Sequence, residues 1–138
     1  MNYIFTDIDG VLNTINRTDW NQYSIELYNK VCDEFDLKSI ITSTWRIKHS
    51  IDQLQQIFLQ KGIDVEIYDY TPILNEPRGL EIESYLFKNI DLVDDKWIIL
   101  DDSVRDIRPY FSDDKIVHCR SWLGLTEEEY LIIKKYFT

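Results

Sequence analysis

Hydrophobic residues occur at two spacings along the chain, and these spacings predict strands and helices in regular succession. Short runs of apolar and β-branched residues predict five strands, at residues 2–7, 39–43, 65–68, 96–100 and 115–118. Apolar residues three or four positions apart predict four helices, at residues 21–35, 51–61, 79–88 and 126–136. This order favours a doubly wound, three-layer α/β/α (Rossmann-like) fold around a mainly parallel five-stranded sheet.

The first helix shows the clearest periodicity. Its predicted buried face comprises four residues that are each four positions apart, Tyr23, Leu27, Val31 and Phe35. No internal repeat, linker or low-complexity tract interrupts the sequence of elements. We therefore expect a single domain over residues 1–138.

Composition and charge argue against several classes of protein. A hydrophobic content of 44% and a charged content of 29% are typical of a globular chain. The net charge of −10 argues against broad electrostatic binding to nucleic acid or to an anionic membrane. No apolar run approaches the roughly 20 residues of a membrane span, and we expect no signal peptide before the first strand. Cys32 and Cys119 have no metal-ligand spacing, so we expect buried, reduced thiols and a cytoplasmic location.

Polar side chains follow three of the predicted strands at their carboxyl ends. These are Asp7 and Asp9 after the first strand, Ser43 at the end of the second, and Asp101 and Asp102 after the fourth. In a doubly wound fold, ligands bind beyond the carboxyl ends of the strands. If these strands are neighbours, four carboxylates meet in one crevice and repel one another unless a cation lies between them. Because the ligands are hard oxygen atoms, the sequence predicts a Mg²⁺ site.

The same residue types supply the groups that phosphoryl transfer needs. A carboxylate beside Mg²⁺ can attack phosphorus and form an aspartyl-phosphate. A second carboxylate two residues later can protonate the leaving oxygen and then activate water. A hydroxyl and a cationic side chain would hold the remaining phosphoryl oxygens. Arg78 is the candidate cation, and Arg17, Arg46 and Lys48 also lie in segments predicted near the site.

Four segments of the chain resemble the motifs of the haloacid dehalogenase-like (HAD) phosphohydrolases. FTDIDGVLN resembles the first motif, a hydrophobic strand followed by D-x-D-G, and IITS resembles the second, a strand that ends in Ser or Thr. WIILDDS resembles the fourth, a strand that ends in paired acids, and Arg78 is the best match to the third, a lone Lys or Arg. The strings TSTWR, PRGLEI and GLTEEE are similar to the small single-domain branch of the family that accompanies RNA-repair proteins.

The resemblance implies a role for each matched residue. Asp7 would be the nucleophile and a Mg²⁺ ligand, and Asp9 would be the general acid and base, with its backbone carbonyl facing the metal. Ser43 would hydrogen-bond the phosphoryl group, and Arg78 would neutralise its charge. The acid at position 9 implies transfer or hydrolysis of phosphate, because dehalogenation does not need it.

The resemblance also implies the remaining metal ligands and an open site. Asp101 would bind Mg²⁺, directly or through water, with Asp102 assisting; which of the two leads stays open, and Asp106 is a reserve candidate. Many HAD enzymes carry a cap domain inserted after the first or second motif. Here the predicted helices, loops and one short strand fill the segments between motifs. We therefore expect no cap, and a small flap that contains Arg17 and Trp20.

An open site suits large substrates. We expect a Mg²⁺-dependent phosphomonoesterase whose phosphorylated substrate is a nucleotide or a polynucleotide end, although the net charge does not favour nucleic acid. No membrane partner is expected, and the oligomeric state stays open. Two alternatives remain, a non-enzymatic phosphoacceptor of the receiver type and a catalytically idle interaction module. A receiver uses a Lys after its fifth strand, whereas the fifth strand here is followed by Cys119 and Arg120.

Overall fold

A parallel sheet forms the centre of the protein. The computed structural model describes residues 1–14 and 20–138, and in this part of the chain five strands pair in the order β3-β2-β1-β4-β5. Every pairing is parallel. The strands are β1 (Asn2–Thr6), β2 (Leu37–Ile41), β3 (Ile67–Tyr70), β4 (Lys96–Asp101) and β5 (Ile116–His118). The first and fourth strands are therefore neighbours, as a shared site at their tips requires.

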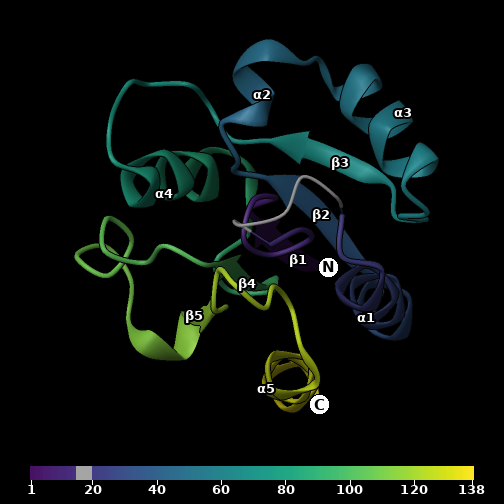
Figure 1. Cartoon of the computed structure of the whole chain (residues 1–138). Helices are drawn as coiled ribbons and strands as arrows, with labels where there is room; N and C mark the ends of the chain where they lie inside the picture. The colour runs from purple at the N-terminus through teal and green to yellow at the C-terminus, as the bar shows by residue number, and fades with distance from the viewer. Residues whose placement is uncertain (15–19) are drawn as a thin grey trace.

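Helices cover both faces of the sheet. They are α1 (Gln22–Glu34), α2 (Trp45–Lys48), α3 (Ile51–Gln60), α4 (Arg78–Asn89) and α5 (Glu127–Phe137), with one 3₁₀ turn at Asp113–Lys115. Figure 1 shows α4 on one side of the sheet and α1, α3 and α5 on the other. The doubly wound α/β/α architecture predicted from the sequence is confirmed. The short helix α2 was not predicted.

The central strand explains why both faces are covered. Successive side chains of a strand point to opposite faces. Tyr3 and Phe5 of β1 pack with Ile82 and Tyr85 of α4, whereas Ile4 belongs to the cluster on the opposite face. The rings of Phe5 and Tyr85 meet edge to face, with centroids 5.7 Å apart. A strand that buries both faces in this way reads as a continuous hydrophobic run.

Strand β2 begins and ends two residues earlier than its sequence pattern predicts. Asp36 adopts a left-handed conformation with φ 50° just after α1, and the parallel ladder starts at the next residue, Leu37, which pairs with Asn2. The polar residues Thr42 and Ser43 therefore lie beyond the strand, in the turn that leads into α2. Strand β3 is displaced in the other direction and begins two residues later than predicted.

The buried face of α1 differs from the predicted one in the first turn. Tyr23 was expected to be buried, but 52% of it is exposed. The prediction is wrong because Tyr23 is only the second residue of the helix. In this first turn the side chains that face the core are those of Ser24 and Ile25. Phe35 lies one residue beyond the last turn, where its ring stacks on Phe137 of α5 at a centroid distance of 5.9 Å.

The two cysteines are free and buried, as predicted. Burial raises the pKa of the Cys32 thiol to about 12, and it also raises the pKa of Cys119 well above its ordinary value. Neither thiol carries charge at neutral pH, which is consistent with a packing role. None of the helices in the described segments has both the length and the apolar character that crossing a bilayer would require.

Candidate active site

Three carboxylates meet at the carboxyl ends of β1 and β4. Asp7 follows β1, Asp101 ends β4 and Asp102 comes next, and one oxygen of each lies within 4.8 Å of the others. The parallel pairing continues past the last residue of β1, because the amide of Asp7 donates to the carbonyl of Leu100 at 3.0 Å. The sheet itself therefore brings together two acids that lie far apart in the sequence.

Backbone amides hold the two buried carboxylates in a fixed orientation. The amide of Ile8 donates to Oδ1 of Asp7 at 2.9 Å, and the amide of Ser103 donates to Oδ1 of Asp101 at 2.9 Å. In both side chains the second oxygen, Oδ2, is the one that faces Arg78. The local turns after β1 and β4 thus orient the acids before any ligand binds.

Arg78 lies between the two acids. Its Nη1 is 2.9 Å from Oδ2 of Asp101 and 3.2 Å from Oδ2 of Asp7. The residue is the first of α4, and its backbone amide donates to Oδ2 of Asp106 at 3.2 Å. Gly79 follows, and its amide donates to the carbonyl of Asp106 at 3.1 Å. Asp106, the reserve metal ligand, therefore anchors the start of α4 and stands outside the three-carboxylate cluster.

The charges in this crevice are not balanced. Burial raises the pKa of the Asp7 carboxyl well above its ordinary value, repulsion from Asp101 adds to the effect, and Arg78 opposes it. Burial also raises the pKa of Asp101, against the opposing effects of Arg78 and the Ser103 amide. For Arg78, burial would lower the pKa of the guanidinium, but the two carboxylates outweigh it and raise that pKa. The pair of acids would be stabilised by one further positive charge.

The donor set fits a hard divalent cation. Three carboxylates from two neighbouring turns offer oxygen atoms within 4.8 Å of one another, and oxygen ligands suit Mg²⁺ far better than they suit zinc or copper. The raised pKa values of Asp7 and Asp101 show that both groups are poorly stabilised as carboxylates. A cation bound between them would favour their ionised forms, so these pKa values also suit a metal site. Asp7, Asp101 and Asp102 are the residues that would hold the metal.

Asp9 occupies a different position from the three clustered acids. Its side chain is exposed, and its carboxylate accepts one hydrogen bond from Nδ2 of Asn13 at 2.9 Å and another from Nε1 of Trp45 at 3.1 Å. The carboxylate is therefore held beside the cluster rather than within it. This leaves only the backbone carbonyl of Asp9 for the metal contact that the family resemblance implies, and it keeps the carboxylate available for proton transfer.

Ser43 lies in the turn between β2 and α2 and is almost fully buried. The amide of Thr42 donates to the carbonyl of Thr6 at 3.0 Å, which extends the pairing of β1 and β2 up to this turn. The hydroxyl oxygen of Ser43 accepts a hydrogen bond from the amide of Trp45 at 3.2 Å. Its remaining hydrogen-bonding capacity can serve a ligand.

Comparison with known families covers almost the whole chain. The model of the family described as "HAD domain in Swiss Army Knife RNA repair proteins" matches residues 3–130. The chain belongs to this family. Neither the comparison with curated proteins nor that with solved structures found a match. The resemblance seen in the sequence is therefore confirmed, and membership supports a phosphohydrolase type of activity for this HAD domain.

The fold of the HAD domain brings the sequence-predicted residues to one end of the sheet. Asp7 and Asp101 share contacts with Arg78, while Asp9 and Ser43 are linked through Trp45, which donates from its indole to one and from its amide to the other. Arg17, expected in a flap over the site, lies outside the described residues.

Arg46 lies beside the Ser43 turn, in a segment that the sequence places near the site, but its charge is paired and not free for a substrate. The side chain is buried, and its Nη2 lies 2.7 Å from Oε1 of Glu81. Its other donors bond to the carbonyls of Thr42, Ser43, Thr71 and Pro72. Arg46 therefore holds the Ser43 turn against the loop before α4. Thr71, Pro72 and Glu81 are distant from Arg46 in the sequence, so no local pattern could have revealed that it joins these segments.

Two residues that contact Asp9 were also missed. The sequence indicates only a polar loop around Asn13, and it favours a packing role for Trp45 over that of a base-stacking platform. Their hydrogen bonds to the same carboxylate depend on how the turn after β1 meets the turn after β2, and Trp45 is 36 positions from Asp9. A tryptophan shows no sequence signal for such a contact.

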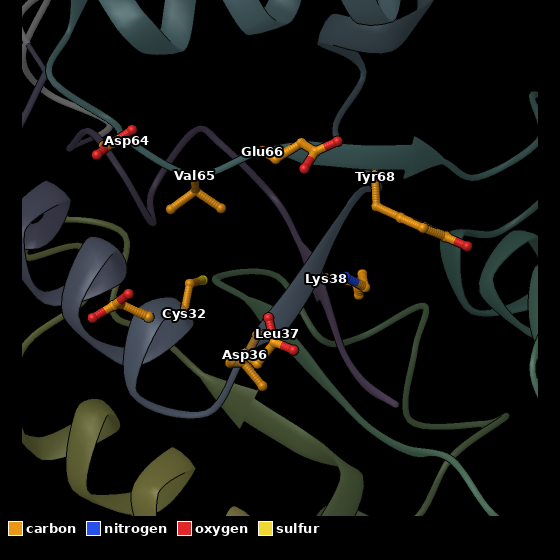
Figure 2. A pocket seen from close by; sticks show the side chains of 9 residues that line it. Cys32, Asp36, Leu37, Lys38, Asp64, Val65, Glu66 and Tyr68 are labelled. Atoms are coloured by element: carbon orange, nitrogen blue, oxygen red, sulfur yellow. The ribbon is translucent and has the colours of Figure 1, made fainter.

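The HAD domain also has a cavity at the opposite end of β2. It has a volume of about 190 Å³, and Figure 2 shows the side chains of Cys32 and Val65 pointing toward one another across it. Asp36, Asp64 and Glu66 lie around it. None of the sequence-predicted catalytic residues lines this cavity, so it has no part in the chemistry considered below.

Proposed function

We propose that this HAD domain is a Mg²⁺-dependent phosphomonoesterase that works through an aspartyl-phosphate on Asp7. The observation that carries the proposal is the convergence of Asp7, Asp101 and Asp102 on one point with Arg78 beside them. When bound by these acids, Mg²⁺ supplies positive charge that stabilises and orients the phosphoryl oxygens. Family membership supports the same class of chemistry.

In the first step a carboxylate oxygen of Asp7 attacks the phosphorus of the ester. A bond forms between that oxygen and phosphorus, and the bond from phosphorus to the ester oxygen breaks. Asp9, in its protonated form, gives its proton to the departing oxygen. The hydroxyl of Ser43 and the guanidinium of Arg78 hold the phosphoryl oxygens, whose charge must be stabilised as the group transfers.

In the second step the ionised Asp9 takes a proton from water as the water oxygen attacks phosphorus. The bond between phosphorus and the Asp7 oxygen breaks, which releases inorganic phosphate and regenerates the carboxylate. Asp9 is then protonated for the next cycle. Its fixation by Asn13 and Trp45 supports this double role, because a general acid and base must keep its position through both steps.

We propose a nucleotide or a polynucleotide end as the substrate. The matching family is described from RNA repair proteins, and the sequence-predicted absence of a cap suits a large substrate. The net charge of −10 makes binding through a broad basic surface unfavourable, so recognition would depend on contacts at the site. The free, buried cysteines suit a reducing compartment such as the cytoplasm.

The test is release of inorganic phosphate from a panel of nucleotides, phosphorylated DNA and RNA ends, sugar phosphates and p-nitrophenyl phosphate. We expect turnover only with Mg²⁺, and we expect Asp7→Asn to abolish it. The matched control is Asp113→Asn, since the Asp113 side chain is 87% exposed. Absence of turnover on every ester would contradict the proposal. A stable, stoichiometric phosphoryl adduct without turnover would instead favour the phosphoacceptor alternative.

A further inference from the structure

A cavity of about 300 Å³ opens directly beside Asp9. It lies on the side of the candidate site formed by the turn after β2 and by α2, and its lining comprises Asp9, Thr44, Trp45, Ile47, Lys48 and His49. The volume is at the lower end of the range for small-molecule sites. This cavity has no role in the chemical steps described above, although it shares the proposed general acid with them.

The position of Asp9 decides what the cavity can hold. If the proposed function is right, on which this inference rests, the oxygen that leaves phosphorus must come within hydrogen-bonding distance of the Asp9 carboxylate. The organic part of the substrate is attached to that oxygen. It therefore lies against a surface that borders Asp9, and the cavity provides such a surface.

The walls of the cavity are aromatic and apolar. The rings of Trp45 and His49 stack with their centroids 5.5 Å apart and their planes 26° from parallel. Ile47 is 57% exposed although it is a large apolar residue. Among the described residues that line it, Asp9 is the one acid, and Lys48 adds a positive charge. A planar heteroaromatic ring gains from such walls by stacking and apolar contact, whereas a sugar or a glycerol chain has no comparable surface to offer.

We propose that this cavity binds the nucleobase of a nucleotide leaving group. The base lies against the Trp45–His49 pair and Ile47, which orients the ester oxygen toward Asp9. Lys48, which also lines the cavity, contributes attraction for the anionic substrate that the acidic chain otherwise lacks. The preference for nucleotides over other phosphate esters then comes from this cavity, which contacts the leaving group. Ser43 and Arg78 contact only the phosphoryl group and do not distinguish one ester from another.

The kinetic test changes a wall residue without touching the proposed catalytic groups. Ile47→Asp places a charge in the apolar wall, and Ile132→Asp on α5 is the matched control because Ile132 is 50% exposed. We expect Ile47→Asp to raise the KM for adenosine 5′-monophosphate about tenfold, the size of a lost base-stacking contact. The KM for glycerol 3-phosphate, on which only the added charge acts, should rise clearly less than that for the nucleotide, and the control should change neither. An equal effect on both esters, or no effect on either, overturns the inference.

A binding test separates this inference from the proposed function. Isothermal titration of Asp7→Asn in Mg²⁺ should show adenosine 5′-monophosphate binding about tenfold more tightly than ribose 5-phosphate, and Ile47→Asp in the same background should remove the difference. Equal binding of the two ligands overturns the base site even if the enzyme hydrolyses phosphate esters. Preferential binding of the nucleotide with no hydrolysis of any ester supports the base site and contradicts the proposed function.

Two further variants distinguish stacking from a structural role of His49. The ring nitrogen Nδ1 of His49 lies 3.0 Å from the carbonyl of Trp45, so the residue also supports α2. His49→Ala should weaken nucleotide binding, and His49→Phe, which keeps an aromatic ring but loses the hydrogen bond, should restore it. Failure of the phenylalanine variant to restore binding overturns the role of stacking. Hydrolysis of phosphotyrosine with the same dependence on Ile47 would overturn the assignment to a nucleobase.

Discussion

Gly10 packs so closely against the carboxylate of Asp102 that a single methyl group on its Cα would overlap that carboxylate. The glycine also has φ +79°, a conformation that L side chains rarely adopt. Its amide donates to Oδ1 of Asn13 at 2.9 Å, and Asn13 in turn holds Asp9. Asp102, which follows β4, therefore requires a glycine at position 10, directly after Asp9.

We expect Gly10→Ala to reduce phosphatase activity by about a hundredfold, because displacement of a reacting group by about 1 Å has effects of that size. The matched control is Gly62→Ala. Gly62 has φ +83°, so the backbone strain is comparable, but the nearest atom to an added methyl is 3.9 Å away. The control should lose about 1–2 kcal/mol of unfolding free energy and keep its activity. Equal activities of the two variants would show that the contact with Asp102 has no functional effect.

The raised pKa values of Asp7 and Asp101 predict how stability depends on pH without metal. Both carboxyls bind protons more tightly in the folded protein than at their ordinary pKa of 3.8. Their contribution to the free energy of unfolding is therefore complete below that value and is lost as pH rises through the raised folded pKa values. Mg²⁺ should reverse the loss, because it binds the folded state and favours the ionised acids.

Asp7→Asn should consequently stabilise the metal-free protein at pH 7. Removal of a buried charge that is poorly compensated gains about 1 kcal/mol or more, which raises the Tm by about 4 °C in a chain of this size. The gain should disappear at acid pH, where the wild-type carboxyl is protonated, and added Mg²⁺ should raise the Tm of the wild type more than that of the variant. Thermal unfolding across pH, with and without EDTA, tests this. A variant less stable than the wild type at pH 7 would contradict it.

The buried pair of Arg46 and Glu81 predicts a large effect for a conservative change. Arg46→Lys keeps the charge but cannot reproduce the planar set of donors that reaches four carbonyls and a carboxylate. We expect a loss of about 3 kcal/mol in unfolding free energy, measured by urea denaturation. Arg108→Lys is the control, since Arg108 pairs with the exposed Asp113 and should cost roughly 0.5 kcal/mol or less. Similar losses in the two variants would be incompatible with the bracing role of Arg46.

Two buried threonines next to the site predict opposite responses to the same substitution. The hydroxyl of Thr6 donates to the carbonyl of Asp7 at 2.8 Å, whereas the hydroxyl of Thr42 is buried without a hydrogen-bond partner among the described residues. Thr6→Val should cost about 1 kcal/mol, and Thr42→Val should be neutral or stabilising. Chemical denaturation of both variants compares them directly. Destabilisation of both to the same extent would indicate that Thr42 has a partner.

The architecture could be predicted because burial on both faces of a parallel sheet leaves a strong local pattern. β1 and β4 read as continuous hydrophobic runs, and the acids directly after them mark where each run ends. The boundaries were less predictable. β2 is displaced by two residues because the ladder begins where the chain turns at Asp36. Tyr23 was expected to be buried because it lies four residues before Leu27, but the buried face of α1 does not include that position.

The amino-acid sequence by itself determined where the polar groups stand, two acids after one buried strand, paired acids after another and a hydroxyl after a third, and this placement is what indicates the kind of chemistry. Only the tertiary structure decided how those groups are held. The indole of Trp45 on Asp9, the bracing of the Ser43 turn by Arg46, and the contact of Gly10 with Asp102 all join segments that are remote in the chain. A side chain's local pattern reports whether it will be buried, but its hydrogen-bond partner is set by which turns the sheet order makes neighbours.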